Sequence, residues 1–299
     1  MENKATIIIA THKKYQMPAD KMYLPVHVGA EGKKDSDGND LDLGYVKDNT
    51  GDNISLKNPS FCELTGLYWA WKNVDSDYVG LAHYRRHFSL SKKSKDPFDN
   101  ILTYDELAPL LSKYRVFVPK KRKYYIETLY SHYAHTHYAE HLDVTKEIIA
   151  EKYPDYTDSC NKVYKQTYGY MFNMMIMRKD LFQNYCEWLF NILFELEKRI
   201  GESSKELSFF QGRFYGRVSE IIFNVWLDYQ VKSGTISQKD IKEIPCIYTE
   251  KIDWNRKVKS FIGAKFGHKK YEGSFRTRLC VFCILLTIYP ILVEFKNGL

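Results

Sequence analysis

The amino-acid sequence predicts an α/β fold in which a mainly parallel, Rossmann-type sheet is flanked by helices. Two apolar runs, Ile7–Ala10 and Tyr78–Ala82, do not alternate with polar residues, which is typical of parallel strands buried on both faces. Segments with helical periodicity separate such runs, and strands that alternate with helices indicate a parallel sheet. A polar segment follows each run, so candidate functional residues fall at the carboxyl edge of the sheet.

In the first half of the chain, two helices are expected between the strands. The expected strands cover residues 7–10, 25–29 and 78–82, and the expected helices cover residues 60–73 and 103–114. Ser60 and Glu63 have the spacing of a capping box at the first helix, and Thr103 and Glu106 have it at the second. Gly, Asp and Asn dominate residues 31–53, which predicts a surface loop.

The second half continues this alternation. The expected strands cover residues 115–119 and 169–177, and the expected helices cover residues 124–152, 180–200 and 217–231. An apolar stripe along the 180–200 segment predicts a long amphipathic helix. The residues Gly216–Ser219 are interpreted as a turn that enters the last helix.

The composition changes near residue 250, which predicts a catalytic domain over residues 1–250 and a membrane-associating segment over 251–299. Between Lys251 and Arg278, nine Lys or Arg stand against two acidic residues, so this stretch carries +7, as much as the whole chain. The fifteen residues Leu279–Val293 are uncharged, fewer than the roughly 20 that a spanning helix needs. A basic and apolar helical tail at an anionic membrane surface fits this order, and a core helix that closes the domain is the alternative.

Several classes of protein lose support from the sequence. With 44% hydrophobic and 27% charged residues the chain is not disordered. The sequence contains no Walker loop, GxGxxG or GxSxG motif, and its six cysteines lack zinc-site spacing. No secretory signal is recognised, so we expect a cytoplasmic protein that is peripheral at the inner face of the plasma membrane.

Two polar segments at strand ends are the first candidates for ligand binding. The first is Thr11-His12-Lys13, and the second is His83-Tyr84-Arg85-Arg86. Two adjacent Arg at such an edge can bind a diphosphate through their fork-shaped donors, and a surface ion-pair cluster is the alternative. These residue types point to a phosphorylated ligand.

Two helical segments supply further candidates. The stretch Ser131–His141 contains four His, whose HxxxH spacing is a weak zinc signal. One His that donates to a substrate hydroxyl or phosphate is the preferred interpretation. Glu220, near an expected helix start, has the chemistry of a general base. The alternative is that Ser219 caps the helix and Glu220 interacts with its dipole.

These pieces together resemble the bacterial capsular and O-antigen polysaccharide glycosyltransferase family that was long catalogued as a domain of unknown function. The resemblance covers roughly residues 5 to 250. The matching segments are Ala10–Lys13, 52–58, 61–73, Asp77–Arg86, 172–177, 186–189 and Arg217–Leu227. The resemblance implies a GT-A-like fold and hexose transfer from a nucleotide sugar. Some relatives look like galactofuranosyl or galactosyl transferases, which suggests a UDP-linked donor.

On this basis each candidate residue receives a role. Glu220 is assigned as the catalytic base, and Glu63 is the rival, to which the capping-box spacing already gives a structural role. Donor binding is assigned to Thr11, His12, Lys13, Asn58, His83, Tyr84, Arg85 and Arg86, and acceptor binding to His137, Asn173 and Ser219. The expected acceptor is a growing lipid-linked saccharide.

A metal cofactor is not assigned, although the family's general plan allows Mn or Mg. GT-A enzymes commonly hold such a metal with an Asp-x-Asp motif, and Asp75-Ser76-Asp77 has that spelling. It precedes the 78–82 strand instead of following it, so we expect no metal there.

A nucleic-acid-binding or nucleic-acid-modifying protein is the alternative function. It would use the same basic stretch and the abundant aromatic residues, which make up 15% of the chain. Because the basic stretch adjoins an apolar tail and no binding-module pattern is present, nucleic acid is not an expected partner.

Overall fold

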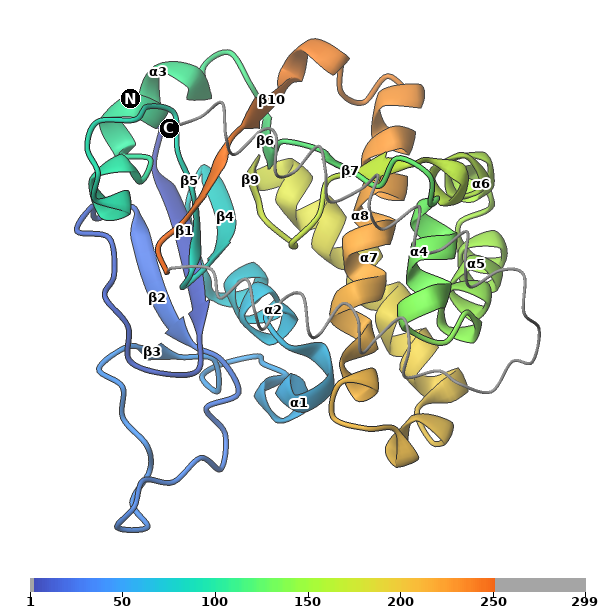
Figure 1. Ribbon diagram of the computed structural model, residues 1–299, viewed down its shortest axis with the longest axis horizontal. Helices are drawn as coiled ribbons and strands as arrows, with labels where there is room; N and C mark the ends of the chain where they lie inside the picture. The colour runs from blue at the N-terminus through green and yellow to red at the C-terminus, as the bar shows by residue number, and fades with distance from the viewer. Residues whose placement is uncertain (1–2, 251–299) are drawn as a thin grey trace, which may run out of the picture. The chain divides into compact units, whose positions relative to one another are not determined.

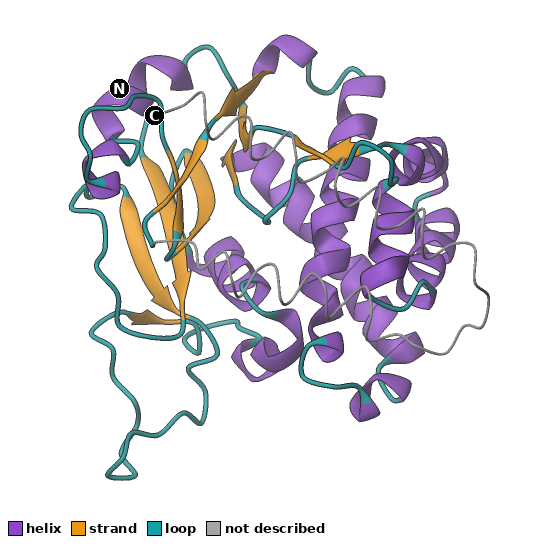
Figure 2. Ribbon diagram, viewed as in Figure 1, coloured by secondary structure: helices purple, strands orange, loops and turns teal. Residues whose placement is uncertain are grey.

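The computed structural model describes residues 3–250, which form a mixed α/β domain around one sheet (Figure 1; Figure 2). Its strands are β1 (Ala5–Thr11), β2 (Tyr23–His27), β3 (Val46–Lys47), β4 (Tyr78–His83), β5 (Arg86–Phe88), β6 (Val116–Pro119), β9 (Met175–Arg178), β10 (Ile241–Ile244) and β11 (Cys246–Tyr248), with β7 (Arg122–Lys123) and β8 (Tyr168–Gly169) as a separate pair. Its α-helices are α1 (Asn58–Phe61), α2 (Leu64–Asn73), α3 (Tyr104–Leu111), α4 (Leu129–Thr136), α5 (Glu140–Lys152), α6 (Thr157–Lys165), α7 (Lys179–Ile200) and α8 (Phe214–Lys232). The predicted tail, 251–299, lies outside the described residues, and within them no helix is long and apolar enough to cross a membrane.

The predicted mainly parallel sheet is confirmed, with the antiparallel strand β9 at its centre, with β5 attached antiparallel to β4 and with β11 attached antiparallel to β5. The strand order is β10-β6-β9-β4-β1-β2-β3, and β1 pairs in parallel with both β2 and β4. Strand β9 runs antiparallel to β4 and β6, because the chain enters it at the carboxyl edge of β4, with Met175 opposite Leu81. The turn before β9 therefore reaches the same edge as the ends of β1 and β4.

The absence of alternation in β1 is explained by helices on both faces of the sheet. Ile7, Ile8 and Ile9 are all fully buried. Ile8 belongs to the apolar cluster that includes α2, α7 and α8, whereas Ile7 and Ile9 pack with α3 in a second cluster. Full burial of each side chain is worth about 1.5–3 kcal/mol, so this strand anchors both layers.

The predicted helix over 60–73 is wrong in its first turn. Cys62 has φ +55°, a left-handed conformation that ends α1 and lets α2 start at Leu64. The predicted capping box is absent there, since the Ser60 hydroxyl donates to the Lys57 carbonyl instead. The box formed by Thr103 and Glu106 at α3 is confirmed.

Other boundaries also differ. The predicted helix over 124–152 is divided into α4 and α5, with non-helical residues before α4 and between the two helices. The predicted strand over 169–177 is divided between β8 and β9. Helix α8 begins at Phe214, so Gly216 and Ser219 lie within its first turns instead of forming an entry turn. Ring packing accounts for the early start, because Phe214 stacks on His141 with centroids 3.8 Å apart.

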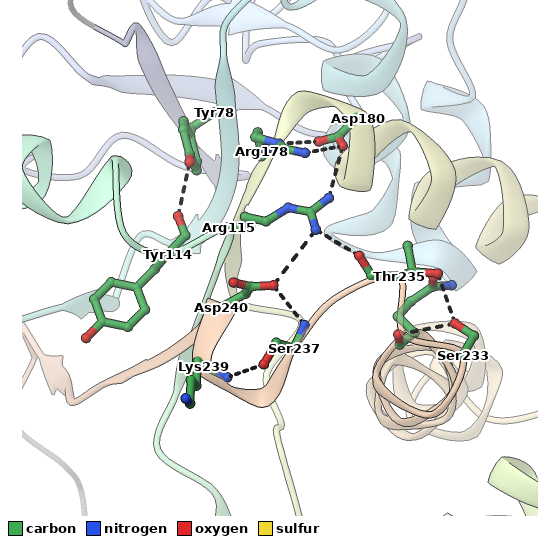
Figure 3. Close-up of polar contacts among 11 residues, drawn as sticks. Tyr78, Tyr114, Arg115, Arg178, Asp180, Ser233, Thr235, Ser237, Lys239 and Asp240 are labelled. Carbon is green, nitrogen blue, oxygen red and sulfur yellow. Dashed lines mark hydrogen bonds and ion pairs between the residues drawn. The ribbon is translucent and has the colours of Figure 1, made fainter.

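At the amino edge of the sheet, Arg115 joins three segments, as Figure 3 shows. Its guanidinium donates to the Thr235 carbonyl oxygen at 2.8 Å and lies 3.3 Å from Asp180, at the start of α7. Asp240 lies 3.9 Å away, and Arg178 also pairs with Asp180 at 2.7 Å. These charged side chains form ion pairs with one another, so we assign this edge of the sheet a structural role.

We predict that Gly80→Ala lowers the free energy of unfolding by about 1–3 kcal/mol, the usual cost of overpacking. An added Cβ at Gly80 would lie 2.8 Å from the Met175 carbonyl oxygen and 2.9 Å from Ile176, where neither strand can give way. Gly212→Ala is the matched control, because nothing lies within 4 Å of its added Cβ. Urea denaturation measures both variants, and equal midpoints would contradict the close packing of β4 against β9.

Candidate functional site

The candidate site forms where four segments meet at the carboxyl edge of the sheet. These are the ends of β1 and β4, the turn before β9 and the first turns of α8. His83 ends β4 in register with Ala10 of β1, so Thr11 and His12 follow beside it. The His83 Nε2 atom lies 2.5 Å from the carbonyl oxygen of Phe172 in the turn. The topology therefore unites segments that are far apart in the sequence.

Asn173 links that turn to α8 and to Glu63. Its side-chain nitrogen donates to Glu63 Oε1 at 2.7 Å and to the Gly216 carbonyl oxygen at 2.9 Å, and its oxygen accepts from the Ser219 hydroxyl at 2.9 Å. Asn173 and Ser219 are 3% and 0% exposed, and the sequence assigned both to acceptor binding. In this position Ser219 orients Asn173, and Asn173 orients Glu63, while a direct contact of either residue with an acceptor stays a prediction.

Glu220 is a nearly buried carboxyl group near the start of α8. Its side chain is 8% exposed, and Arg217 Nη1 lies 3.4 Å from its Oε1. Burial raises the pKa of Glu220 above its ordinary value, Arg217 opposes this rise, and the Glu63 carboxylate adds to it. Two carboxyl groups and a guanidinium thus act on one another, an arrangement suited to acid–base chemistry.

The two adjacent arginines have different surroundings. The guanidinium carbon of Arg86 lies 3.7 Å from the ring centroid of Phe172, and its buried Nε has no hydrogen-bond partner among the described residues. Arg85 is exposed, lies 4.8 Å from the ring of Tyr84 and forms a 3.4 Å ion pair with Glu250. Arg86 therefore has an unpaired N–H group within the site, and Arg85 lies at the rim of the site.

The loop after β1 is ordered by its own side chains. The Thr11 side chain is buried, and its hydroxyl donates to the Lys13 carbonyl oxygen at 2.7 Å. Thr11 therefore stabilises the conformation of this loop. His12 meets Tyr84 edge-on at 5.5 Å, and Tyr84 stacks on Tyr15 at 4.0 Å. Burial and then Lys13 lower the pKa of His12, which favours the neutral form of its imidazole.

Asn58 supports the broken helix next to the site. Its side-chain nitrogen donates to the Cys62 carbonyl oxygen at 2.8 Å and to Thr65 Oγ1 at 3.1 Å. It also packs on Gly29, where an added Cβ would lie 2.5 Å from Asn58 Cγ. The predicted contact of Asn58 with the nucleotide-sugar donor would use its side-chain oxygen, because the side-chain nitrogen already donates within the protein.

The four predicted histidines do not converge. His132 and His135 both bind the Glu127 carboxylate at 2.7 Å, and His141 binds the Tyr133 hydroxyl at 2.8 Å. His137, at the end of α4, stacks on Tyr133, and burial followed by Arg217 lowers its pKa to about 4. Within residues 3–250, no group of three or more His, Cys, Asp and Glu is arranged to hold a metal ion.

The residues Asp75 and Asp77 do not fit a metal on a donor diphosphate. Asp75 forms a 2.6 Å ion pair with Lys179, and Asp77 accepts from the backbone nitrogen of Lys4 at 2.8 Å. Both precede β4, at the end opposite His83. A cavity of about 590 Å³ at this end is lined by Asp77 and Lys179 among other residues, so it is separate from the candidate site.

Sequence reasoning set one important carboxylate aside and missed another. Glu63 was the rival candidate for the base and was given a capping-box role, but that box does not form. Asp48 is fully buried and accepts from the Gly29 and Ala30 backbone nitrogens at 2.8 and 3.1 Å and from Thr65 at 2.6 Å. No periodicity or motif marks Asp48, because its partners come from separate segments, the loop after β2 and the first turn of α2.

Backbone strain is concentrated around the same region. The described non-glycine residues with positive φ are Cys62, Tyr125, Phe172 and Asn173. Three of them flank the contact between Asn173 and Glu63, and such strain is typically retained where function requires it.

Comparisons with known proteins bear on the family and the fold. A protein-family model described as Domain of unknown function (DUF4422) matches residues 6–231. The apo structure of WbbM, a bifunctional glycosyltransferase, is similar, with a TM-score of 0.74 and 29% identity. The alignment covers 83% of this chain and 46% of that one, so this chain spans about half the length of WbbM. No curated protein sequence matches.

We predict that Glu220→Gln increases stability at alkaline pH. A carboxyl group whose folded pKa is raised stabilises the fold fully below its unfolded pKa, and this contribution is lost as pH rises through the folded pKa. The free energy of unfolding of the Gln variant should therefore exceed that of the wild type at pH 8, and this difference should become smaller toward pH 4. Denaturant titrations between pH 4 and pH 8 measure the two free energies. A difference that does not change with pH would mean that the pKa of Glu220 is not raised in the folded protein.

Proposed function

This chain belongs to the family described as Domain of unknown function (DUF4422), and we propose that it is a glycosyltransferase. In this proposal it moves a hexose, galactofuranose or galactose, from a UDP-linked donor to a growing lipid-linked capsular or O-antigen saccharide. The similarity to a bifunctional glycosyltransferase supports the reaction class. The observation that carries the proposal is the convergence of Arg86, Arg217, Glu63 and Glu220 at the ligand-binding edge of the sheet.

The reaction makes one bond and breaks one bond. The acceptor hydroxyl oxygen bonds to the anomeric carbon, the bond from that carbon to the donor phosphate breaks, and the nucleoside diphosphate leaves with the electron pair. The leaving diphosphate gains negative charge, which fixed cations stabilise. Arg86, with its unpaired Nε, and the half-exposed Arg217 supply this charge, and Arg85 and Lys13 add to it at the rim.

The acceptor proton goes to a carboxylate. Glu220 remains the proposed base, because its raised pKa improves its match to a hydroxyl proton at neutral pH. Glu63 is the rival, since no capping role occupies it and the Asn173 hydrogen bond fixes its orientation. His137 and His83 stay as proposed contacts to the acceptor and the donor.

In this proposal the enzyme works at the inner face of the plasma membrane, next to its lipid-linked acceptor. The basic and apolar segment 251–299 supports this location through its sequence pattern. A cytoplasmic site is also where nucleotide sugars are available. The proposed scheme assigns no step to a metal. The side chains of Asp75 and Asp77 interact with Lys179 and with the backbone nitrogen of Lys4.

We predict that Arg86→Ala loses more transfer activity than Arg85→Ala. Loss of a charge-assisted contact costs about 1.5–3 kcal/mol, or roughly tenfold to over a hundredfold in kcat/KM if the contact acts in the transition state. Arg85 already has an exposed partner in Glu250, so its loss should cost less. Steady-state kinetics on folded variants measure both. Near-normal turnover of Arg86→Ala would remove its diphosphate role.

We predict that Glu220→Gln lowers turnover by about a hundredfold or more while donor affinity changes little, because general-base catalysis contributes at least this much. Glu63→Gln is the matched comparison. If Glu63→Gln abolishes turnover and Glu220→Gln does not, the base is Glu63. A screen of the wild type against a panel of nucleotide sugars comes first, and no transfer or donor hydrolysis from any of them would contradict the proposed function.

A further inference from the structure

The segment Lys120–Ile126 is a charged and apolar surface that the proposed chemistry does not use. It contains the run Lys120-Lys121-Arg122-Lys123, followed by two tyrosines and an isoleucine. Part of it forms β7, which pairs with β8 apart from the main sheet (Figure 1). No acidic residue occurs within it.

Most of the cations in this segment lack acidic partners. Lys121 lies 3.8 Å from Glu243 and 5.3 Å from the ring of Tyr168. Lys120, Arg122 and Lys123 are exposed and form no ion pair with any residue in the range 3–250. The nearest acidic residue along the chain, Glu127, is occupied by two histidines. An anionic partner would therefore meet uncompensated positive charge.

Apolar side chains lie exposed next to these cations. Tyr125 and Ile126 are each 62% exposed, on a turn held by a hydrogen bond from Ile126 to the Tyr124 carbonyl oxygen at 2.8 Å. Tyr125 adopts φ +59°, a conformation that costs a residue with a Cβ about 1–3 kcal/mol. A strained turn that presents a tyrosine and an isoleucine to solvent beside lysines has the composition of a membrane-interface contact.

The surface borders the candidate site. Lys123 pairs with Tyr168 across the strand pair, and the preceding residue, Arg122, lies 5.0 Å from the ring centroid of Tyr124. Both Arg122 and Arg217 act electrostatically on Glu220 and on Tyr124. A bilayer in contact with this segment would therefore lie close to the site.

We propose that Lys120–Ile126 docks the enzyme on an anionic lipid bilayer, with Lys120 and Lys123 at the headgroups and with Tyr125 and Ile126 inserted between them. This inference rests on the proposed function, because the bilayer would carry the acceptor. It is independent of the segment 251–299. Nucleic acid is disfavoured, because the exposed pair includes an isoleucine, which cannot stack on a base.

Flotation of the full chain with phospholipid vesicles tests the proposal and needs no turnover. The vesicles contain phosphatidylcholine with or without one third phosphatidylglycerol. Each basic residue near an anionic surface contributes about fivefold in partitioning, so Lys120→Ser/Lys123→Ser should bind roughly 25-fold more weakly. Tyr125→Ser/Ile126→Ser should also weaken binding. Lys92→Ser/Lys95→Ser is the control with the same change in charge, and it should partition like the wild type.

Each alternative outcome has a distinct meaning. Equal flotation of all variants overturns the proposal and leaves membrane contact to another segment. If the Lys120→Ser/Lys123→Ser variant floats normally but binds UDP less tightly, the segment serves the donor phosphate and the lipid proposal fails. If the segment variants lose flotation but no nucleotide sugar is used, the docking surface stands and only the proposed function fails.

Discussion

The carboxyl edge of this sheet depends on one buried carboxylate, that of Asp48. It has no exposed surface, and it accepts from two backbone nitrogens after β2, from the Ser55 hydroxyl at 2.5 Å and from the Thr65 hydroxyl at 2.6 Å. A buried charge without such donors would cost several kcal/mol, so the donors and the carboxylate require one another. The contacts bind the loop after β2, the 3₁₀ turn Ser55–Lys57 and α2 into one unit.

This unit determines where Glu63 lies. Glu63 directly precedes α2 and follows the left-handed residue Cys62, so any shift of α2 moves its carboxylate. On the opposite side, Asn173 is held by Ser219 and by the Gly216 carbonyl oxygen, which settles which end of its amide faces Glu63. The site is therefore rigid on both sides of the contact, and preorganised groups of this kind do not have to reorganise during a reaction.

The sequence predicted the parts of the fold that follow from local pattern. The apolar runs of β1 and β4 were recognised because burial on both faces removes their alternation, and the topology then placed His83 and Arg86 at the ligand-binding edge. The break at Cys62 could not be predicted, since a cysteine carries no signal for a left-handed residue. Glu63 was misassigned for the same reason. The bridge through Asn173 was also beyond sequence reasoning, because it joins residues 110 positions apart.

The antiparallel strand β9 has a consequence for how the chain folds during synthesis. Its neighbour β4 ends at residue 83, whereas β9 begins at residue 175, so the residues of β4 that pair with β9, Tyr78–Leu81, lack this partner until the later segment emerges from the ribosome. Unpaired edges favour association between chains, and contacts between distant residues slow folding because loop closure must come first. The contact of His83 with Phe172 closes only when β9 is in place. The nascent chain is thus prone to aggregation until β9 pairs with β4. The candidate site is completed at the same step.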